Sequence, residues 1–122
     1  MKLFCIFEIP AMRVHLIKKK TIETFIAHNT GSKVPFRIWL GVIKWADWKN
    51  PSDIIKTFNS ADILGRGSDR VVFNIGGNKF RMICKYHFGI SRVHLFITWI
   101  GTHNAYNRIC DKNEQYDIED IG

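Results

Sequence analysis

The stretch RVVFNIGGNKFRMICKYHF, residues 70–88, decides the fold because it contains two strands and the turn between them. Residues 70–75 and 79–88 are rich in β-branched and aromatic side chains, which favours strands. Gly76 and Gly77 permit positive φ angles and therefore a tight hairpin turn. We expect two antiparallel strands joined at this point.

Two further apolar runs complete the expected sheet. Residues 92–100, RVHLFITWI, follow the second strand after the short turn GIS, so the second half of the chain reads as an antiparallel meander. Residues 12–17, MRVHLI, read as a first strand, which three consecutive lysines end. The sequence therefore predicts one N-terminal strand and three C-terminal ones.

The helices are expected between these strands. Thr21 can cap a first helix, which polar residues and glycine stop from Asn29 onward. A second helix is expected from Pro35 to about Asp47, because its apolar residues recur at the spacing of a core-facing helix, and a third, short one within residues 50–58. This order predicts an α+β domain in which an N-terminal strand and two to three helices pack on one face of a small antiparallel sheet.

The charge of the chain is its unusual property. Lysine and arginine number 18 against 11 aspartate and glutamate residues, a formal net charge of +7. Five of the acids follow residue 110, so residues 1–110 hold 17 basic and six acidic residues and carry +11. A body this basic favours a polyanion partner, with RNA, DNA and an anionic membrane surface as candidates. A solvated basic surface without a partner is the alternative.

The cysteines and the N-terminus indicate a cytoplasmic protein with one domain. Three cysteines without a CxxC spacing are typical of a reducing compartment. Residues 1–11 do not read as a signal peptide, because a glutamate and a proline interrupt them, and no apolar window approaches the roughly 18 residues of a membrane span. We expect a domain at 12–111, an N-terminal extension before it for which Met12 is an alternative start, and an acidic tail at 112–122.

Alternation along the strands predicts a basic surface on the face that the helices leave open. In residues 79–88, Arg81 and Lys85 point away from the helix-covered face and lie about 13 Å apart, at ~3.3 Å per residue. Residues 70–75 add two polar side chains to the same face. The expected basic trough, which suits a phosphodiester chain, consists of Arg70, Asn74, Arg81 and Lys85.

Three segments of the chain, in this order, are KWADWKNPSDI, FNIGGNKFR and IGTHNAY. In order and spacing they resemble the HigB-type toxins of bacterial type II toxin-antitoxin systems, which belong to the RelE superfamily of small α+β ribonucleases. The resemblance covers roughly residues 12–111. It implies a RelE-like fold, an endoribonuclease that cleaves messenger RNA on the ribosome, and a HigA-type antitoxin partner with a helix-turn-helix DNA-binding domain.

The resemblance also implies, by motif position, four catalytic residues, which are Asn78, Arg81, His103 and Tyr106. The surface argument adds four RNA-binding candidates, namely Lys79, Lys85, Arg70 and Asn74. Cleavage without a metal needs the RNA 2′-hydroxyl to attack the adjacent phosphate. The enzyme must then orient the strand, move protons and stabilise a charged phosphorane.

Each catalytic candidate has a chemical role and a plainer alternative. His103 can move protons near neutral pH or simply end a strand. Arg81 offers a permanently charged fork to phosphate, or forms a salt bridge with Asp69. Tyr106 can stack on a base, donate from its hydroxyl or only pack, and Asn78 can bind phosphate or serve the turn.

Other classes of function find less support in the sequence. The five histidines show no i, i+4 pair and the cysteines are scattered, so we expect no metal ion and no other cofactor. Two alternatives stay open: a same-fold toxin that inhibits a topoisomerase, and a non-catalytic RNA-binding or ribosome-binding module. For the acidic tail, we hypothesise that it folds over the basic trough and competes with RNA.

Overall fold

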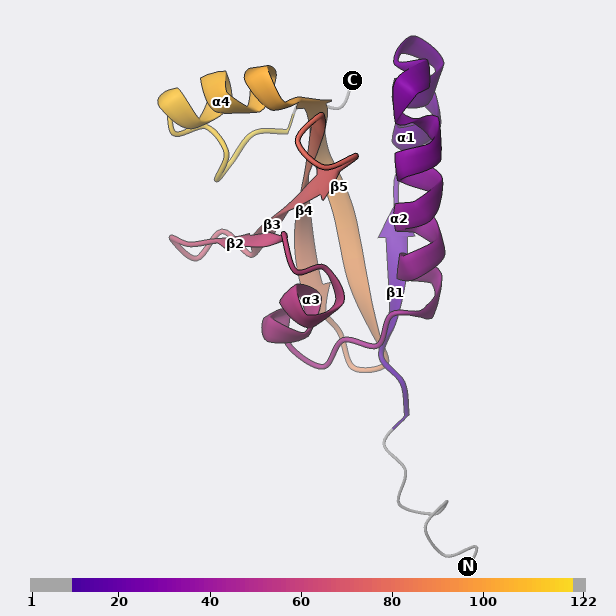
Figure 1. Cartoon of the computed structure of the whole chain (residues 1–122). Helices are drawn as coiled ribbons and strands as arrows, with labels where there is room; N and C mark the ends of the chain where they lie inside the picture. Colours follow the sequence, from indigo (N-terminus) through magenta and orange to yellow (C-terminus); the bar gives the residue numbers. More distant parts are fainter. Residues whose placement is uncertain (1–9, 120–122) are drawn as a thin grey trace, which may run out of the picture.

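In the computed structural model, which describes residues 10–119, five strands form one mixed sheet with α-helices on both faces (Figure 1). The expected N-terminal extension lies outside the described residues up to residue 9, as do residues 120–122 of the expected tail. In chain order the elements are β1 (Arg13–Ile17), α1 (Lys19–His28), the 3-10 turn η2 (Thr30–Ser32), α2 (Lys33–Trp45), α3 (Pro51–Thr57), β2 (Asp62–Leu64), β3 (Arg70–Ile75), β4 (Phe80–Phe88), β5 (Arg92–Thr102) and α4 (His103–Asp111).

The strand order is β1-β5-β4-β3-β2, and the expected meander of β3, β4 and β5 is confirmed. Gly76 and Gly77 both have φ of 67°, the left-handed conformation that the tight hairpin between β3 and β4 requires. Two features differ from the expectation. β1 pairs with β5 in parallel, so the sheet is mixed, and the short strand β2, which the sequence did not indicate, extends the opposite edge.

α1, α2 and α3 pack against the same face of the sheet and form the main core. The expected apolar stripe of α2 is confirmed, since Phe36, Trp39 and Ile43 are buried there. Ile22 of α1 and Ile54 of α3 are fully buried in the same cluster. From the sheet this core receives Val71, Phe73, Ile75, Met82, Cys84, Tyr86, Val93, Leu95 and Ile97.

The helix boundaries differ from the expected ones for local reasons. α1 begins before Thr21, because Lys18 adopts a left-handed conformation with φ of 68° and turns the chain directly from β1 into the helix. α2 begins at Lys33, two residues before Pro35. Proline is tolerated there because backbone N–H groups in the first turn of a helix have no acceptor within the helix, so the missing N–H of proline costs no hydrogen bond. Among the described helices none is long and apolar enough to cross a membrane.

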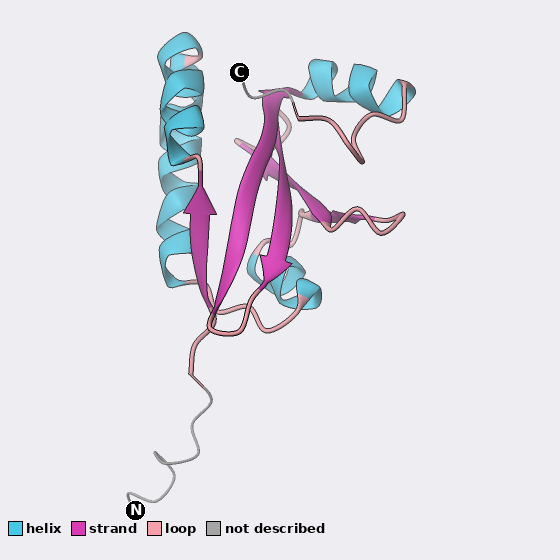
Figure 2. Cartoon of the chain, turned by 180° about the vertical axis from the view of Figure 1, so that it is seen from behind, coloured by secondary structure: helices cyan, strands magenta, loops and turns pink. Residues whose placement is uncertain are grey.

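A fourth helix corrects the expectation that helices cover only one face. α4 lies on the opposite side of the sheet from α1 and α2, as Figure 2 shows from behind. The side chain of Thr102 caps it, because its Oγ1 accepts a hydrogen bond from the Ala105 N–H at 3.2 Å. Below α4 a second core cluster contains Leu64, Val72, Ile83, Trp99 and Ile109.

A β-bulge in β5 connects the two cores. Ile83 pairs with Trp99 while Cys84 pairs with Ile97, so that Thr98 is an extra residue on β5. As a result Ile97 belongs to the main core, whereas Trp99, two residues later, belongs to the cluster below α4. The Trp99 ring then lies over Gly101, and a Cβ atom at Gly101 would be 2.4 Å from ring atom Cζ2.

The Gly101→Ala substitution is expected to lower the free energy of unfolding by about 2–3 kcal/mol, because the buried Trp99 ring cannot move aside without disturbing the core. Urea denaturation measures this change. Gly41→Ala in α2 is the matched control, since nothing lies within 4 Å of its added methyl group and alanine favours the helix by up to about 1 kcal/mol. A Gly101→Ala protein as stable as the original chain would contradict this packing.

Candidate active site

The four catalytic candidates come from two elements that meet at one end of the sheet. Asn78 and Arg81 belong to the β3–β4 hairpin, whereas His103 and Tyr106 lie on the first turn and a half of α4. The His103 N–H donates a hydrogen bond of 3.0 Å to the Lys79 carbonyl, which ties α4 to the hairpin. Arg81 also lies directly opposite Gly101, two residues before α4 begins.

Arg81 is only 7% exposed, and its hydrogen-bond partners are neutral oxygens. Nη1 donates to the carbonyls of Gly77 at 3.2 Å and Phe80 at 3.1 Å, and Nη2 donates to Oδ1 of Asn78 at 3.4 Å. Within residues 10–119 Arg81 forms no ion pair, and the anticipated salt bridge with Asp69 is absent. A buried guanidinium without an anion is a strong site for one.

The two nitrogens of the His103 ring have different surroundings. Nδ1 is buried and has no hydrogen-bond partner among the described residues. Nε2 lies 3.4 Å from Nδ2 of Asn107, one turn further along α4. Because the amide group offers N–H donors, Nε2 is assigned as the acceptor, and the proton of the neutral ring is then on Nδ1. The lone pair suited to take up a proton is therefore on Nε2.

The Tyr106 hydroxyl is held in its neutral form. Burial raises the pKa of Tyr106 far above its ordinary value, and the Cys110 thiol and the Asp62 carboxylate act in the same direction, while Arg81 opposes them. The ring packs 6.2 Å from that of Trp99, measured between centroids. A phenol that keeps its proton can donate a hydrogen bond to a phosphate oxygen, but it cannot act as a base at neutral pH.

The turn residues hold this end of the sheet together. Asn78 accepts a hydrogen bond from Arg81, so its side chain at present serves the hairpin. Lys79 contributes its carbonyl to the bond with His103. Asn74 is the β3 partner of Arg81, and it lines a groove beside α2. Asn74 and Lys79 therefore contact or neighbour catalytic candidates, Asn74 as the strand partner of Arg81 and Lys79 through the His103 N–H.

The prediction that Arg70 lies in an open trough is wrong. Arg70 is 3% exposed, and its Nη1 donates to the Ile118 carbonyl at 2.6 Å and to the Gln115 carbonyl at 3.4 Å. Nη2 forms an ion pair of 3.6 Å with Glu119, and burial lowers the pKa of the guanidinium, an effect that the acids of the tail oppose. The described part of the tail thus folds over this face of the sheet, and Arg70 anchors it.

Lys85 stays on the surface, apart from the hairpin turn. It lines a cavity of about 430 Å³ on the outer face of β4 and β5, together with Lys18, His87, Phe96 and Glu119. The cavity combines two cations with two rings, and one carboxylate from the tail lies at its border. Such a cavity suits one nucleotide of an RNA that extends toward the catalytic candidates, because the lysines can bind its phosphate and a ring can stack on its base.

Sequence reasoning missed contacts that only strand register creates. His15, His94 and His87 occupy one row across β1, β5 and β4, and Nδ1 of His15 lies 3.4 Å from Nδ1 of His94. The His87 ring stacks on that of His94. The three histidines could not be grouped from the sequence, because no i, i+4 spacing relates them. No cluster of three His, Cys, Asp or Glu side chains that could hold a metal occurs within the described part of the chain.

Comparison with known families gives one match. The family model HigB_toxin, described as a RelE-like toxic component of a toxin-antitoxin system, matches residues 32–109. This range runs from the start of α2 into α4 and contains the hairpin, His103 and Tyr106. A comparison with curated proteins finds no match.

Replacing Arg70 with methionine is expected to lower the free energy of unfolding by about 2–3 kcal/mol, because the carbonyls of Gln115 and Ile118 lose a charged donor. Amide hydrogen exchange should accelerate over residues 112–119. Lys85→Met is the control, because Lys85 is the β4 partner of Arg70 but is exposed. This variant should change the free energy of unfolding by no more than about 0.5 kcal/mol. Unchanged exchange in the tail would show that Arg70 is not its anchor.

The raised pKa of Tyr106 predicts how stability depends on pH. An unfolded tyrosine loses its proton near the ordinary value of 10.0, whereas folded Tyr106 keeps it, so above that pH the folded state binds more protons and stability falls as pH rises. Tyr106→Phe should lose less stability than the original chain between about pH 9.5 and pH 11 in urea titrations. Tyr116→Phe is the control, and equal slopes for all three proteins would contradict the burial of the Tyr106 hydroxyl.

Proposed function

Because this chain belongs to the HigB family of RelE-like toxins, the toxic components of toxin-antitoxin systems, we propose that it is an endoribonuclease that cleaves messenger RNA without a metal ion. The ribosome is the proposed place of action, because RNA threaded through it presents a single strand whose 2′-hydroxyls are accessible. The family implies an antitoxin partner.

The observation that carries the proposal is the state of Arg81. Two arginines of this chain are buried, and the acidic tail neutralises one of them, Arg70. Arg81 has comparable burial, but its partners among residues 10–119 are carbonyl and amide oxygens. Burying a charge without a counterion is unfavourable, and a phosphate oxygen would form shorter, charge-assisted bonds with the same nitrogens. The position therefore favours a phosphate next to His103 and Tyr106.

The residues divide the chemistry among them. Nε2 of His103 takes the proton from the 2′-hydroxyl, whose oxygen attacks the adjacent phosphorus. Arg81 stabilises the charge that develops on the phosphorane, and neutral Tyr106 donates a hydrogen bond to it. The bond to the 5′ oxygen then breaks and that oxygen takes up a proton from water, while His103 returns its proton to the solvent. The products end in a 2′,3′-cyclic phosphate and a 5′-hydroxyl. Asn78 orients the phosphate beside Arg81.

Binding of the strand extends beyond the reacting phosphate. Lys79 next to the turn and Lys85 in the outer cavity supply charges for flanking phosphates, and the exposed ring of Phe96 offers a stacking surface. Arg70 is not part of this proposed path, since its donors are used by the tail. The lysines are expected to set affinity, whereas the groups at the hairpin and α4 set the rate.

His103→Ala is expected to lower the rate of message cleavage by about 10²–10⁴-fold, because the step loses its base. The assay follows defined messages in a purified translation system and identifies 2′,3′-cyclic phosphate ends. Arg81→Lys should also lower the rate, since a lysine cannot reproduce the two-pronged contact with phosphate. If the purified protein is treated with EDTA and the chelator is removed before ribosomes are added, the rate of cleavage should not change, because the proposed step uses no metal held by the protein.

His28→Ala, an exposed histidine of α1, is the matched control and should cleave at the original rate. Lys85→Ala should weaken RNA binding and reduce its salt dependence by about one unit of slope, with turnover retained. If the original chain inhibits translation without cutting any message, a non-catalytic ribosome-binding role replaces this proposal. If it stops DNA replication and leaves translation intact, inhibition of a topoisomerase replaces it.

A further inference from the structure

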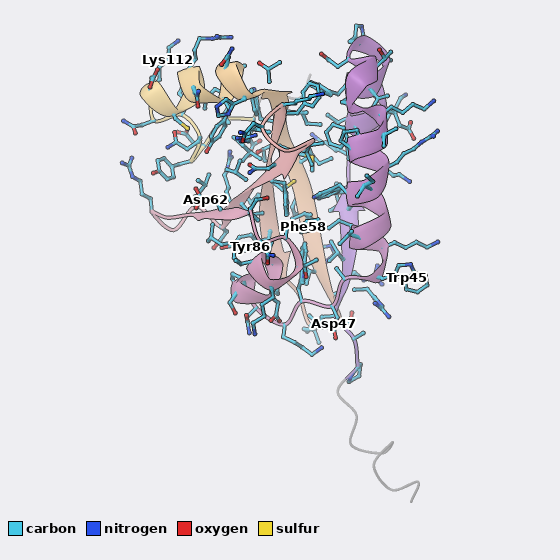
Figure 3. The ribbon with its side chains drawn as sticks, in the orientation of Figure 1. Trp45, Asp47, Phe58, Asp62, Tyr86 and Lys112 are labelled. Atoms are coloured by element: carbon cyan, nitrogen blue, oxygen red, sulfur yellow. The ribbon has the colours of Figure 1, made fainter. Side chains whose placement is uncertain are left out.

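The exposed face of α2 carries large apolar side chains, whereas the outer face of a surface helix is ordinarily polar. Within residues 10–119, four of the six exposed large apolar side chains belong to this helix. Val34 and Ile38 are each 64% exposed, Val42 is 38% exposed and Trp45 is 68% exposed. Figure 3 shows Trp45 at the end of α2, directed away from the body of the protein.

Helical spacing puts these four residues on one stripe. At about 100° per residue, positions 34, 38, 42 and 45 fall within an arc of roughly 80°. The residues that α2 buries in the main core, Phe36, Trp39 and Ile43, lie on the other side of the helix. α2 therefore has two apolar faces, of which the sheet covers one. A continuous exposed stripe of this kind marks an interaction surface.

A groove continues the stripe toward the candidate active site. It has a volume of about 240 Å³ and lies between α2 and the β3–β4 hairpin, where its apolar lining includes Val34, Ile38, Phe58 and Ile75. At the end of the groove is Gly76, and a Cβ there would lie 3.2 Å from Cγ of Pro35. An occupant of the groove would thus contact the turn whose next residue, Gly77, accepts a hydrogen bond from Arg81.

A glycine within the stripe favours close approach of a second backbone. Gly41 lies in the interior of α2, and no atom lies within 4 Å of the place where its Cβ would be. Glycine in such a position destabilises a helix by up to about 1 kcal/mol relative to alanine. No described residue, from 10 to 119, fills the space that it leaves. A segment laid across α2 at this point would use it.

The charges beside the stripe identify the chemistry of the partner. Lys33, Arg37 and Lys44 are exposed and follow one another along one flank of α2. Arg13 and Lys44 also lie over the Trp45 ring, at 5.8 Å and 5.5 Å from its centroid. A second copy of the chain would bring like charges together, which disfavours self-association. A segment with an apolar stripe and acidic flanks complements this surface.

We propose that the exposed stripe of α2 and the adjoining groove are the docking site of the antitoxin, which occupies them with an acidic, amphipathic helical segment. This inference rests on the proposed function only through the antitoxin partner, and RNA cleavage is not part of it. The apolar residues of the segment pack on Ile38 and Trp45, and its acids pair with the basic flank. Its end reaches the Gly76 turn, so that docking acts on the hairpin that holds Arg81.

The test measures binding of the full chain to the purified antitoxin of its toxin-antitoxin system, by titration calorimetry. Ile38→Glu places a charge in the centre of the stripe and is expected to weaken binding by about 100-fold or more. Ile90→Glu is the matched control, because Ile90 is a fully exposed apolar residue of the β4–β5 turn that is not part of the stripe or the groove, and the affinity of this variant should not change. Arg37→Glu should weaken binding less, with a reduced dependence on salt.

Several outcomes would overturn the proposal. One is equal affinity for Ile38→Glu, Ile90→Glu and the original chain, with circular dichroism showing that all three are folded. Another is a dimer of the chain alone that Ile38→Glu dissociates in sedimentation, which would assign the surface to a second copy. Tighter antitoxin binding by a Phe4→Ser, Phe7→Ser variant would assign it to the chain's own N-terminal segment.

The same variants separate this proposal from the proposed function. Ile38→Glu should arrest growth when expressed without the antitoxin, and co-expressed antitoxin should fail to relieve the arrest. His103→Ala should show the converse, with antitoxin affinity unchanged and no message cleavage. If the original chain binds the antitoxin through Ile38 but cuts no RNA, the docking site stands and the nuclease proposal fails. If the original chain cuts RNA while Ile38→Glu still binds the antitoxin, the nuclease proposal stands and the docking site fails.

Discussion

The hydrogen bond from the His103 amide to the Lys79 carbonyl, 3.0 Å long, joins the two parts of the chain on which the candidate active site depends. One part is the hairpin turn, which is tight because both of its glycines have φ of 67°. The other is the first turn of α4, which the side chain of Thr102 caps. With this corner closed, Arg81 of the hairpin and the polar residues of α4 belong to one surface, and catalysis by positioned groups requires such an arrangement.

The two buried arginines show how similar residues on one face of a sheet come to differ in function. Arg70 lies under the tail, and its donors meet two carbonyls and the Glu119 carboxylate, so it contributes to stability. Arg81 lies at the hairpin, where its partners in the described part of the chain are neutral oxygens. The acidic tail makes this difference, because its described part supplies Arg70 with the Gln115 and Ile118 carbonyls and the Glu119 carboxylate, whereas none of the partners of Arg81 among residues 10–119 comes from the tail.

α2 has a comparable double role on the other side of the molecule. Its buried stripe forms the main core with the sheet, whereas its exposed stripe ends in Trp45 and borders a groove that reaches the hairpin. A toxin needs a surface for its substrate and another for the protein that restrains it. The groove beside α2 includes Gly76, and the next residue of that turn, Gly77, accepts a hydrogen bond from Arg81, so the proposed docking site and the candidate active site share one hairpin.

The sequence by itself determined the hairpin at residues 70–88, the meander and the buried stripe of α2, because each follows from local periodicity or from the backbone freedom of glycine. The pairing of Asn78 with Arg81 as site residues came from the family resemblance. Local pattern also placed Arg70 and Arg81 on the same face of the sheet. Only the tertiary structure decided that Arg70 is buried by the tail, that β1 lies parallel to β5 and that burial raises the pKa of Tyr106. These depend on residues far apart in the chain, which alternation and spacing do not encode, since packing energy arises only when distant segments meet.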